Sequence, residues 1–471
     1  MAVLYNVCDI FDNLCEKTSL SIPPLKQNYL KIEFENNDNN ETVYHGQAPT
    51  LPFAASEVYN VPVCNWRHLS VEHPDCKSVY EVTFDISGTN LSFRPGDTIG
   101  VIPKNLDIEV DVVIDHLDLT SVVDCSYTIT VDSGQKGAKI PAHVPVKSRL
   151  RHVLTYCVDI RAVVKKLFLL ALSRYTKDER EKSALEYLCS KEGSPAYATH
   201  ILNKNLCILD LFAIFKTCKP PIEIILEYLP RLLPRPYSIV NSELANSNEL
   251  KICFSVMNIG NNRKGLVTGW LEQIIKEPSL EDLITNISLK EDKVTVVHKV
   301  PIYLRKNINQ FSFPEVFTSP LLLVGPGTGV APYIGLLEQM ECQGNKQGWG
   351  MIWLFFGCRN PNLDFIYKKE LENFVSKGVL NKLTTSFSKW EGSNNKKYIQ
   401  ESILQNGEKV SKLLKEGAKV YICGNVRTMA AQVKETLVKC LVEYTDNTQE
   451  EAEKFISDMQ KNKRYLVDSW N

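Results

Sequence analysis

Apolar and polar residues alternate along two short segments in the first quarter of the chain. Residues 79–86 (VYEVTFDI) predict a half-buried strand. A turn at residues 94–97 (RPGD) precedes residues 98–102 (TIGVI), which predict a second strand. Strand character returns much later, at residues 237–240 and 250–257. We therefore expect an antiparallel β barrel that is interrupted by other structure.

Between these strand segments the spacing of apolar residues becomes helical. They recur three and four positions apart over residues 108–119, 160–175, 178–190 and 206–215. We expect residues 107–229 to form a helical insertion. Residues 1–50 predict weak structure, because residues 33–42 (EFENNDNNET) are acidic and rich in asparagine.

After residue 320 short apolar runs alternate with helical patterns. Strands are expected at residues 321–324, 351–356 and 420–423, and helices at residues 330–341, 364–376 and 429–442. This alternation indicates a parallel α/β sheet. The expected organisation is a linker-like segment over 1–52, a barrel domain with its insertion over 53–314, and an α/β domain over 320–471.

The charge balance argues against a protein that holds nucleic acid by bulk attraction. The 471 residues carry 54 Lys and Arg against 55 Asp and Glu, a net charge of −1, whereas nucleic-acid-binding domains carry a strong basic excess. The first 17 residues lack the basic start of a signal peptide. No run of about 18 apolar residues predicts a membrane helix. We expect a cytoplasmic protein without a membrane anchor.

The 14 cysteines form no C-x-x-C pair, so neither a zinc site nor a thioredoxin-like site is predicted. A disulfide scaffold would be short and dense in cysteine, and this chain is neither. We expect reduced thiols that are buried as small apolar groups, and no metal.

Three glycines, Gly325, Gly327 and Gly329, stand between a predicted strand and a predicted helix. Glycine at such a turn lets the backbone approach a phosphate at the start of a helix. The G-x-G-x-G spacing matches neither the P-loop nor the standard dinucleotide pattern. A tight strand–helix turn is therefore the alternative interpretation.

Three further segments could contact a planar anionic ligand. Residues 235–238 (RPYS) offer a charge, an aromatic face and a hydroxyl, and residues 264–268 (KGLVT) open a helix that could hold a diphosphate. Each has a structural alternative when taken singly, namely a buried strand with a surface arginine, or a plain helix start. Residues 464–471 (RYLVDSWN) carry an aromatic residue one position from the end, which either plugs the core or stacks on a flat ligand.

These segments, taken in order, resemble the diflavin reductases, the relatives of cytochrome P450 reductase that contain a ferredoxin-NADP reductase-like module. Besides RPYS and KGLVT, the resemblance rests on 324–332 (VGPGTGVAP), 355–359 (FFGCR) with Asp364 and Tyr367, 421–425 (YICGN) and 464–470 (RYLVDSW). It covers roughly residues 59–471. The insertion is most similar to that of the methionine synthase reductase branch, at residues such as 156–162 (YCVDIRA) and 168–172 (FLLAL).

The resemblance implies FAD and NADPH as cofactors and hydride transfer as the reaction. The hydride-transfer site would comprise Ser238, Cys423, Asp468 and Trp470, with the Trp470 ring over the flavin. FAD would be bound by Arg235, Tyr237, Ser238, Gly265 and Thr268. The nicotinamide nucleotide would be bound by Gly325, Gly327, Thr328, Gly329, Cys358, Arg359, Ser388, Lys389, Lys397 and Tyr398.

The cationic side chains among these residues favour NADPH over NADH, because they suit a 2′-phosphate better than a ribose hydroxyl. The alternative is a solvated loop, since residues 392–397 (GSNNKK) are polar. Two residues depart from the family pattern. Lys389 stands where arginine is usual and lacks its bidentate fork, which weakens the expected discrimination. Asn425 replaces the usual aspartate.

The family also carries an N-terminal FMN domain, for which residues 1 to about 50 are too few, because a flavodoxin-like domain needs ~100 residues or more. The chain is therefore either truncated or served by a separate FMN protein. The branch resemblance implies electron delivery for reductive reactivation of cobalamin-dependent methionine synthase. The alternatives are another branch, such as a sulfite reductase flavoprotein or a P450 reductase, and a truncated non-catalytic module that binds a partner.

Overall fold

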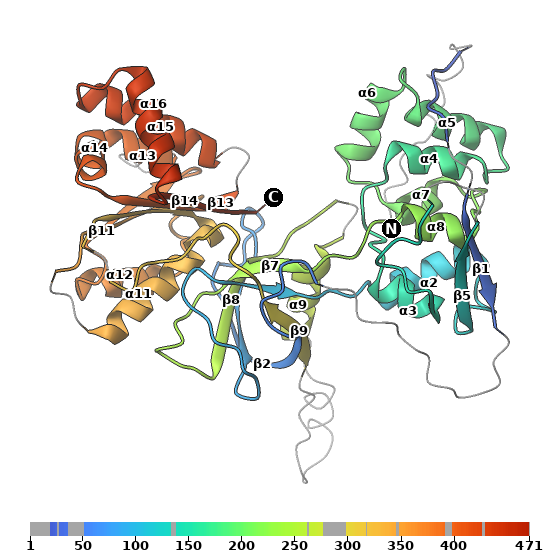
Figure 1. The fold of residues 1–471 in the computed structure, drawn as a ribbon, viewed down its shortest axis with the longest axis horizontal. Helices are drawn as coiled ribbons and strands as arrows, with labels where there is room; N and C mark the ends of the chain where they lie inside the picture. The colour runs from blue at the N-terminus through green and yellow to red at the C-terminus, as the bar shows by residue number, and fades with distance from the viewer. Residues whose placement is uncertain are drawn as a thin grey trace, which may run out of the picture. The chain divides into compact units, whose positions relative to one another are not determined.

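The computed structural model describes residues 19–25, 28–35, 51–132, 138–260, 263–276, 298–316, 318–344, 348–390, 398–425 and 429–470. The chain divides into two compact units (Figure 1). Unit 1 comprises Met1–Leu51, Pro103–Pro234 and Asn258–Leu266, and unit 2 comprises Pro52–Ile102, Arg235–Met257 and Val267–Asn471. Each unit is therefore built from segments that are distant in the sequence.

Unit 1 is mainly helical and contains the predicted insertion. Its helices enclose an apolar core that includes the fully buried Leu169, Leu185 and Ile225. The Asp178 side chain begins one of these helices by accepting the amides of the next turn, which is a common cap. The helices are α2 (Asp107–His116), α3 (Leu150–Tyr156), α4 (Lys166–Ser173), α5 (Glu179–Cys189), α6 (Ser194–Tyr197), η1 (Ala198–Leu202), α7 (Ile208–Ile214) and α8 (Ile222–Tyr228).

A three-stranded antiparallel sheet in unit 1 corrects two sequence expectations. β1 (Leu30–Phe34) pairs with β5 (Ser126–Val131), which pairs with β6 (Lys147–Arg149). The prediction of weak structure over residues 1–50 is thus wrong at β1. The prediction that the insertion is helical is wrong at β5 and β6. The β5 sequence, SYTITV, is rich in the β-branched and aromatic residues that strands favour.

The helix expected from residue 160 begins only at Lys166. A carboxylate oxygen of Asp159 accepts the amide of Arg161 at 3.0 Å and holds a turn instead. The Val164 amide then donates to the carbonyl of Leu206 rather than to a helical partner. Side-chain and long-range hydrogen bonds therefore replace the first turn and a half of the predicted helix.

Six antiparallel strands of unit 2 form the predicted barrel, in the order β7-β4-β9-β2-β3-β8. A bridge between Ile239 and Ile252 closes the sheet, and the Val240 amide donates to the Lys251 carbonyl at 2.9 Å beside it. The helix α9 (Leu266–Lys276) packs against the barrel core. The strands are β2 (Tyr59–His68), β3 (Val79–Asp85), β4 (Thr98–Val101), β7 (Arg235–Ser238), β8 (Glu249–Ser255) and β9 (Lys299–Leu304).

β3 departs from the half-buried strand that its alternating sequence predicts. Every residue from Val79 to Phe84 is buried, and the polar Glu81 and Thr83 are only 5% and 4% exposed. One face of the strand fills the barrel, and on the other face the Glu81 carboxylate accepts a hydrogen bond from the Tyr367 hydroxyl. The alternating sequence correctly predicted that β3 has one apolar and one polar face. It did not predict that other residues bury the polar face.

The remainder of unit 2 is the predicted parallel α/β domain, with strand order β12-β11-β10-β13-β14. Its strands are β10 (Leu321–Pro326), β11 (Ile352–Cys358), β12 (Lys382–Phe387), β13 (Lys419–Asn425) and β14 (Tyr465–Trp470). The short helix η2 (Gly327–Val330), α11 (Ala331–Gln343) and α12 (Lys368–Ser376) contribute to one apolar core. The other face is covered by α13 (Ile399–Gln405), α14 (Gly407–Lys415), α15 (Ala431–Tyr444) and α16 (Gln449–Lys461), as Figure 1 shows.

The last described residues form an edge strand rather than a tail that merely plugs the core. β14 lies parallel to β13 and places Asp468 opposite Cys423. The sequence pattern predicts neither β14 nor β12. Within the part of the chain that the structure describes, every helix is too short or too polar to cross a membrane.

Candidate functional site

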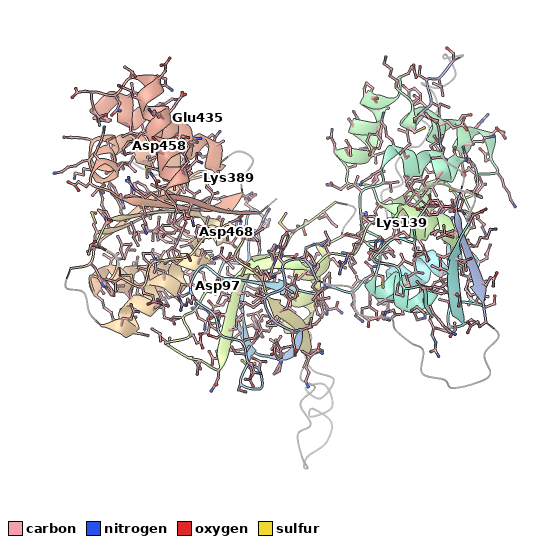
Figure 2. The ribbon with its side chains drawn as sticks, in the orientation of Figure 1. Asp97, Lys139, Lys389, Glu435, Asp458 and Asp468 are labelled. Carbon is pink, nitrogen blue, oxygen red and sulfur yellow. The ribbon has the colours of Figure 1, made fainter. Side chains whose placement is uncertain are left out.

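Ser238, Cys423 and Asp468 come together where the barrel meets the α/β domain. Ser238 ends the barrel strand β7, whereas Cys423 and Asp468 are neighbours on β13 and β14. The Ser238 hydroxyl donates to Oδ2 of Asp468 at 3.3 Å. Figure 2 labels Asp468 at this edge of the sheet. Residues 230 positions apart are thus joined by one hydrogen bond.

The Cys423 thiol is fully buried in this cluster. Burial and then the negative charge of Asp468 raise its pKa well above the usual value, while a hydrogen bond with Ser238 acts in the opposite direction. The thiol is therefore neutral at physiological pH and can offer a proton without being a nucleophile.

β7 also carries the two residues expected to contact a flavin. Arg235 and Tyr237 are half-buried, and the Tyr237 ring meets Phe254 edge-on with centroids 6.4 Å apart. Burial raises the pKa of Tyr237, so its hydroxyl stays protonated. Pro236, which has no amide proton, fits the strand opposite Gly100. The RPYS segment is thus an ordered strand with one aromatic face fixed by packing.

Gly265 immediately precedes α9, as the KGLVT motif predicts. The Thr268 hydroxyl accepts the amide of Met257 at 3.3 Å. One guanidinium nitrogen of Arg161 donates to the Lys264 carbonyl at 2.8 Å, and its Nε bonds to Glu109 at 2.7 Å. The Lys264 carbonyl is therefore held by Arg161 within unit 1, and the Thr268 hydroxyl accepts a backbone amide within unit 2.

The three glycines of the loop after β10 have different reasons for being glycine. A Cβ on Gly329 would lie 2.2 Å from the Cys423 carbonyl oxygen, and one on Gly325 would lie 2.6 Å from the Gly329 carbonyl oxygen. Gly327 alone combines a left-handed backbone, φ 53°, with open space around its Cβ position. Internal packing therefore requires glycine at 325 and 329, whereas Gly327 faces open space beside the half-buried Thr328. The contact of this loop with a nucleotide stays a prediction.

Tyr333 supports this loop and is not among the predicted site residues. Its fully buried hydroxyl lies 3.1 Å from the Val324 carbonyl and 2.9 Å from the Tyr421 carbonyl, between β10 and β13. Burial raises the pKa of this hydroxyl well above its usual value. A polar hydroxyl in the otherwise apolar start of α11 is the sequence signal that could have indicated this role.

A second group of predicted residues gathers at the carboxyl ends of β11 and β12. The amides of Ser388 and Lys389 donate to the carbonyls of Cys358 and Arg359 at 3.0 and 2.8 Å. Lys389, which is labelled in Figure 2, is exposed. The Arg359 side chain donates to the Asp75 carbonyl at 3.2 Å. The edge of the sheet thus presents one lysine to solvent beside an arginine that is tied to the barrel.

The remaining predicted residues are placed less completely. Tyr398 is 54% exposed and stands directly before α13. The Cys358 thiol is half-buried, and burial raises its pKa. Lys397 lies outside the described residues. The Trp470 backbone pairs with Asn425, but the rings and amides of these two side chains lie outside what the structure describes.

Comparison with known proteins places this geometry in a family. Residues 51–270 match the FAD binding domain model, and residues 323–435 match the oxidoreductase NAD-binding domain model. The methionine synthase reductase of Homo sapiens is 34% identical over 97% of this chain, as is that of Rattus norvegicus. NADPH–cytochrome P450 reductase of Dictyostelium discoideum is 32% identical over 88% of the chain. The chain belongs to the diflavin reductase family.

As a diflavin reductase sequence, the chain spans only part of its relatives. It covers 66% of the length of the two methionine synthase reductases and 58% of that of the Dictyostelium P450 reductase. The two matched models begin at residue 51, and before that residue the structure describes the single strand β1. The FMN domain of the family is therefore not among the domains matched in this chain.

The residues present fit the cofactors of a diflavin reductase. The first turn after Pro326 has no side-chain cap, and a Cβ on Gly327 would meet nothing within 4 Å, which leaves room for a phosphate at the start of the helix. The half-exposed Arg235 suits the diphosphate of FAD. These are properties of the described backbone and side chains, and they agree with FAD and a nicotinamide nucleotide as cofactors.

Proposed function

We propose that this chain is an NADPH-dependent flavoprotein reductase in which a hydride passes from NADPH to FAD. The observation that carries the proposal is the contact of Ser238 on the barrel with Asp468 on the α/β domain, with Cys423 beside them. A hydroxyl, a neutral thiol and a carboxylate converge between the two domains whose family models bind FAD and a nicotinamide nucleotide.

FAD and NADPH would supply the hydride acceptor and donor when bound. The residues of the chain then have to orient the two ring systems and exclude water, because hydride transfer depends mainly on positioning. Asp468 holds the Ser238 hydroxyl in one direction, and the Cys423 thiol remains protonated beside it. Arg235 would neutralise the FAD diphosphate, and Lys389 the 2′-phosphate of NADPH. The Trp470 ring would cover the flavin.

Stopped-flow absorbance of the FAD-loaded protein tests the hydride step. Mixing with NADPH under anaerobic conditions should bleach the flavin, and NADH should act more slowly because it lacks the phosphate that Lys389 would bind. Lys389→Ala should narrow this difference, whereas Lys412→Ala, which alters another exposed lysine on α14, should leave it unchanged. Absence of bleaching by NADPH, or equal rates with both nucleotides in the original protein, would contradict the proposal.

We further propose methionine synthase, the cobalamin-dependent enzyme, as the terminal acceptor of the electrons. The support is the similarity to methionine synthase reductases over 97% of the chain. Because the chain is also similar to NADPH–cytochrome P450 reductases, a cytochrome P450 is the second candidate acceptor.

A reconstituted reactivation assay separates these acceptors. NADPH, the FAD-loaded chain, a flavodoxin-type FMN protein and inactive methionine synthase should restore activity in the presence of S-adenosylmethionine, and omission of the FMN protein should abolish most of it. Reduction of a cytochrome P450 with no reactivation of methionine synthase would favour the second candidate.

A further inference from the structure

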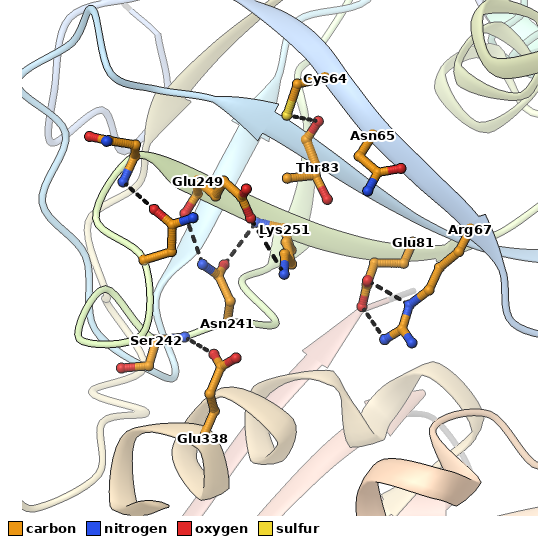
Figure 3. A network of polar contacts seen from close by, with 12 residues as sticks. Cys64, Asn65, Arg67, Glu81, Thr83, Asn241, Ser242, Glu249, Lys251 and Glu338 are labelled. Atoms are coloured by element: carbon orange, nitrogen blue, oxygen red, sulfur yellow. Dashed lines mark hydrogen bonds and ion pairs between the residues drawn. The ribbon is translucent and has the colours of Figure 1, made fainter. Parts of the chain in front are cut away.

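Glu81 is a buried carboxylate on the outer face of the barrel. Its side chain is 7% exposed, and both of its oxygens are bonded to Arg67 of the neighbouring strand β2. The Arg67 Nε donates to Oε1 at 2.7 Å and one terminal nitrogen donates to Oε2 at 3.1 Å, as Figure 3 shows. A bidentate arginine is the arrangement that best compensates a carboxylate removed from water.

The same carboxylate reaches across to the α/β domain. The Tyr367 hydroxyl donates to Oε2 of Glu81 at 2.8 Å. Arg67 also bonds to Glu370 in the first turn of α12, and its guanidinium carbon lies 5.3 Å from the centre of the Tyr367 ring. Contacts therefore run from Arg67 to Glu81, to Tyr367, along the chain to Glu370 and back to Arg67.

Tyr367 holds an unfavourable backbone conformation to make this contact. It has φ 55° and ψ 25°, a left-handed conformation that bulky residues rarely adopt. Its ring is only 3% exposed. Strain of this kind persists where the surrounding structure over-determines it, and it concentrates at sites where function requires it. Tyr367 is the N-cap residue of α12, and its side chain makes no capping hydrogen bond to the first turn.

A second contact between the barrel and α11 lies close to the candidate active site in sequence. The Ser242 amide donates to Oε2 of Glu338 at 2.6 Å (Figure 3). A Cβ on Gly335 would lie 2.9 Å from the Val240 carbonyl oxygen, so α11 approaches the barrel as closely as a helix backbone can. The barrel is therefore bonded to the α/β domain at two places, at Glu338 of α11 and at Tyr367 before α12.

We propose that Arg67, Glu81, Tyr367 and Glu370, together the Glu81 latch, set the orientation of the α/β domain on the barrel and thereby the alignment for hydride transfer. The inference rests on the proposed function. Ser238 belongs to the barrel and Asp468 to the α/β domain, so their 3.3 Å contact depends on the relative orientation of the two domains. The four residues are positioning residues, because none of them is among the residues expected to bind FAD or NADPH.

Tyr367→Phe is the sharpest test, because it removes one hydroxyl and leaves the ring in place. The matched control is Tyr197→Phe in unit 1, which removes a hydroxyl that donates to the Val164 carbonyl at 2.9 Å. At saturating NADPH, Tyr367→Phe should slow flavin reduction by about 10-fold, since a misplacement of ~1 Å can cost up to about 10²-fold. FAD content and the KM for NADPH should stay near those of the original protein, and the control should match it throughout.

Two further readouts distinguish positioning from a general loss of stability. The primary isotope effect with 4-deuterated NADPH should change in Tyr367→Phe and not in the control. In a double-mutant cycle, Tyr367→Phe combined with Ser238→Ala should lower the rate by less than the product of the single effects, because both act on one alignment. A normal rate in Tyr367→Phe, or strictly multiplicative effects, would overturn the latch.

The exchange rates of backbone amide hydrogens test the Glu81 latch without any need for NADPH turnover. Amides of α11 and α12 should exchange faster in Tyr367→Phe than in Tyr197→Phe, because local opening follows loss of contacts. If the original protein is not reduced by NADPH, the proposed function fails while this measurement still decides the latch. Unchanged exchange in both helices would refute the latch even if the enzyme is active.

Discussion

Replacement of Ser238 by alanine removes the hydroxyl that connects the barrel to Asp468. The structure gives a Ser238 Oγ to Asp468 Oδ2 distance of 3.3 Å. The change leaves the side chains of Arg235 and Tyr237, which are expected to bind FAD, in place. We expect Ser238→Ala to retain FAD and to slow its reduction.

The magnitude follows from the hydrogen bond. A bond to a charged group contributes about 1.5–3 kcal/mol, and about 1.4 kcal/mol corresponds to a tenfold change in rate. The contact is longer than the usual O–H···O distance of about 2.7 Å, which places its contribution at the lower end. We therefore expect flavin reduction to slow by about 10-fold at saturating NADPH.

Anaerobic stopped-flow reduction, with FAD content measured from the absorbance spectrum, provides the assay. Ser92→Ala is the matched control, since the Ser92 hydroxyl also donates to a carboxylate, that of Glu243, at 3.0 Å on the exposed surface. A rate equal to that of Ser92→Ala would show that the Ser238 hydroxyl has no part in the alignment. Loss of FAD from Ser238→Ala would show that its role is in binding instead.

Three other predictions follow from the described geometry. Lys389→Arg should raise the ratio of kcat/KM for NADPH over NADH, because arginine can bind a phosphate with two hydrogen bonds; steady-state kinetics with both nucleotides measure it. Gly329→Ala should lower stability by about 2 kcal/mol, because its Cβ would lie 2.2 Å from a carbonyl oxygen of β13; denaturant unfolding measures it, with Gly88→Ala, which meets nothing within 4 Å, as control. Burial raises the pKa of the Cys157 and Cys207 thiols to about 11 from an ordinary 9.0. The unfolded chain therefore loses these protons first, so the free energy of unfolding should be unaffected below pH 9 and fall between pH 9 and 11; constant stability over that interval would contradict it.

The α/β domain was predictable because its central strands are short, continuous apolar runs. β12 escaped prediction because it is an edge strand with a polar sequence, KLTTSF. Its polar groups are satisfied by Trp353 of the next strand: the Lys382 ammonium lies 3.6 Å from the ring centre, and the indole nitrogen donates to Thr384 at 2.8 Å. The contacts that stabilise β12 come from Trp353, which is more than 25 residues away in the sequence. A local sequence pattern therefore cannot predict this strand.

The sequence did not predict the geometry of the candidate site, and the choice of its members rests on the family resemblance. The resemblance named Ser238, Cys423 and Asp468, whereas their contact depends on the pairing of β14 with β13. Sequence spacing also gave the same reason for all three loop glycines, although two of them face the protein interior. The sequence did not predict the Glu81 latch, because the alternating pattern of β3 predicts that the Glu81 side chain faces water.

The interrupted barrel has a consequence for how the protein reaches its folded state. β4 and β7 pair between Val101 and Arg235, so residues 103–234 must lie between two hydrogen-bonded partners. Closing a flexible loop of that length carries an entropic cost of roughly 4 kcal/mol by the usual logarithmic scaling, and non-local pairings of this kind fold slowly. An insertion that folds first brings its own ends together and removes much of that cost. Substitutions that destabilise the core of the insertion should therefore delay the pairing of β7 with β4. Such a substitution would lie far from the flavin and would slow folding of the protein without altering the catalytic rate of the folded enzyme.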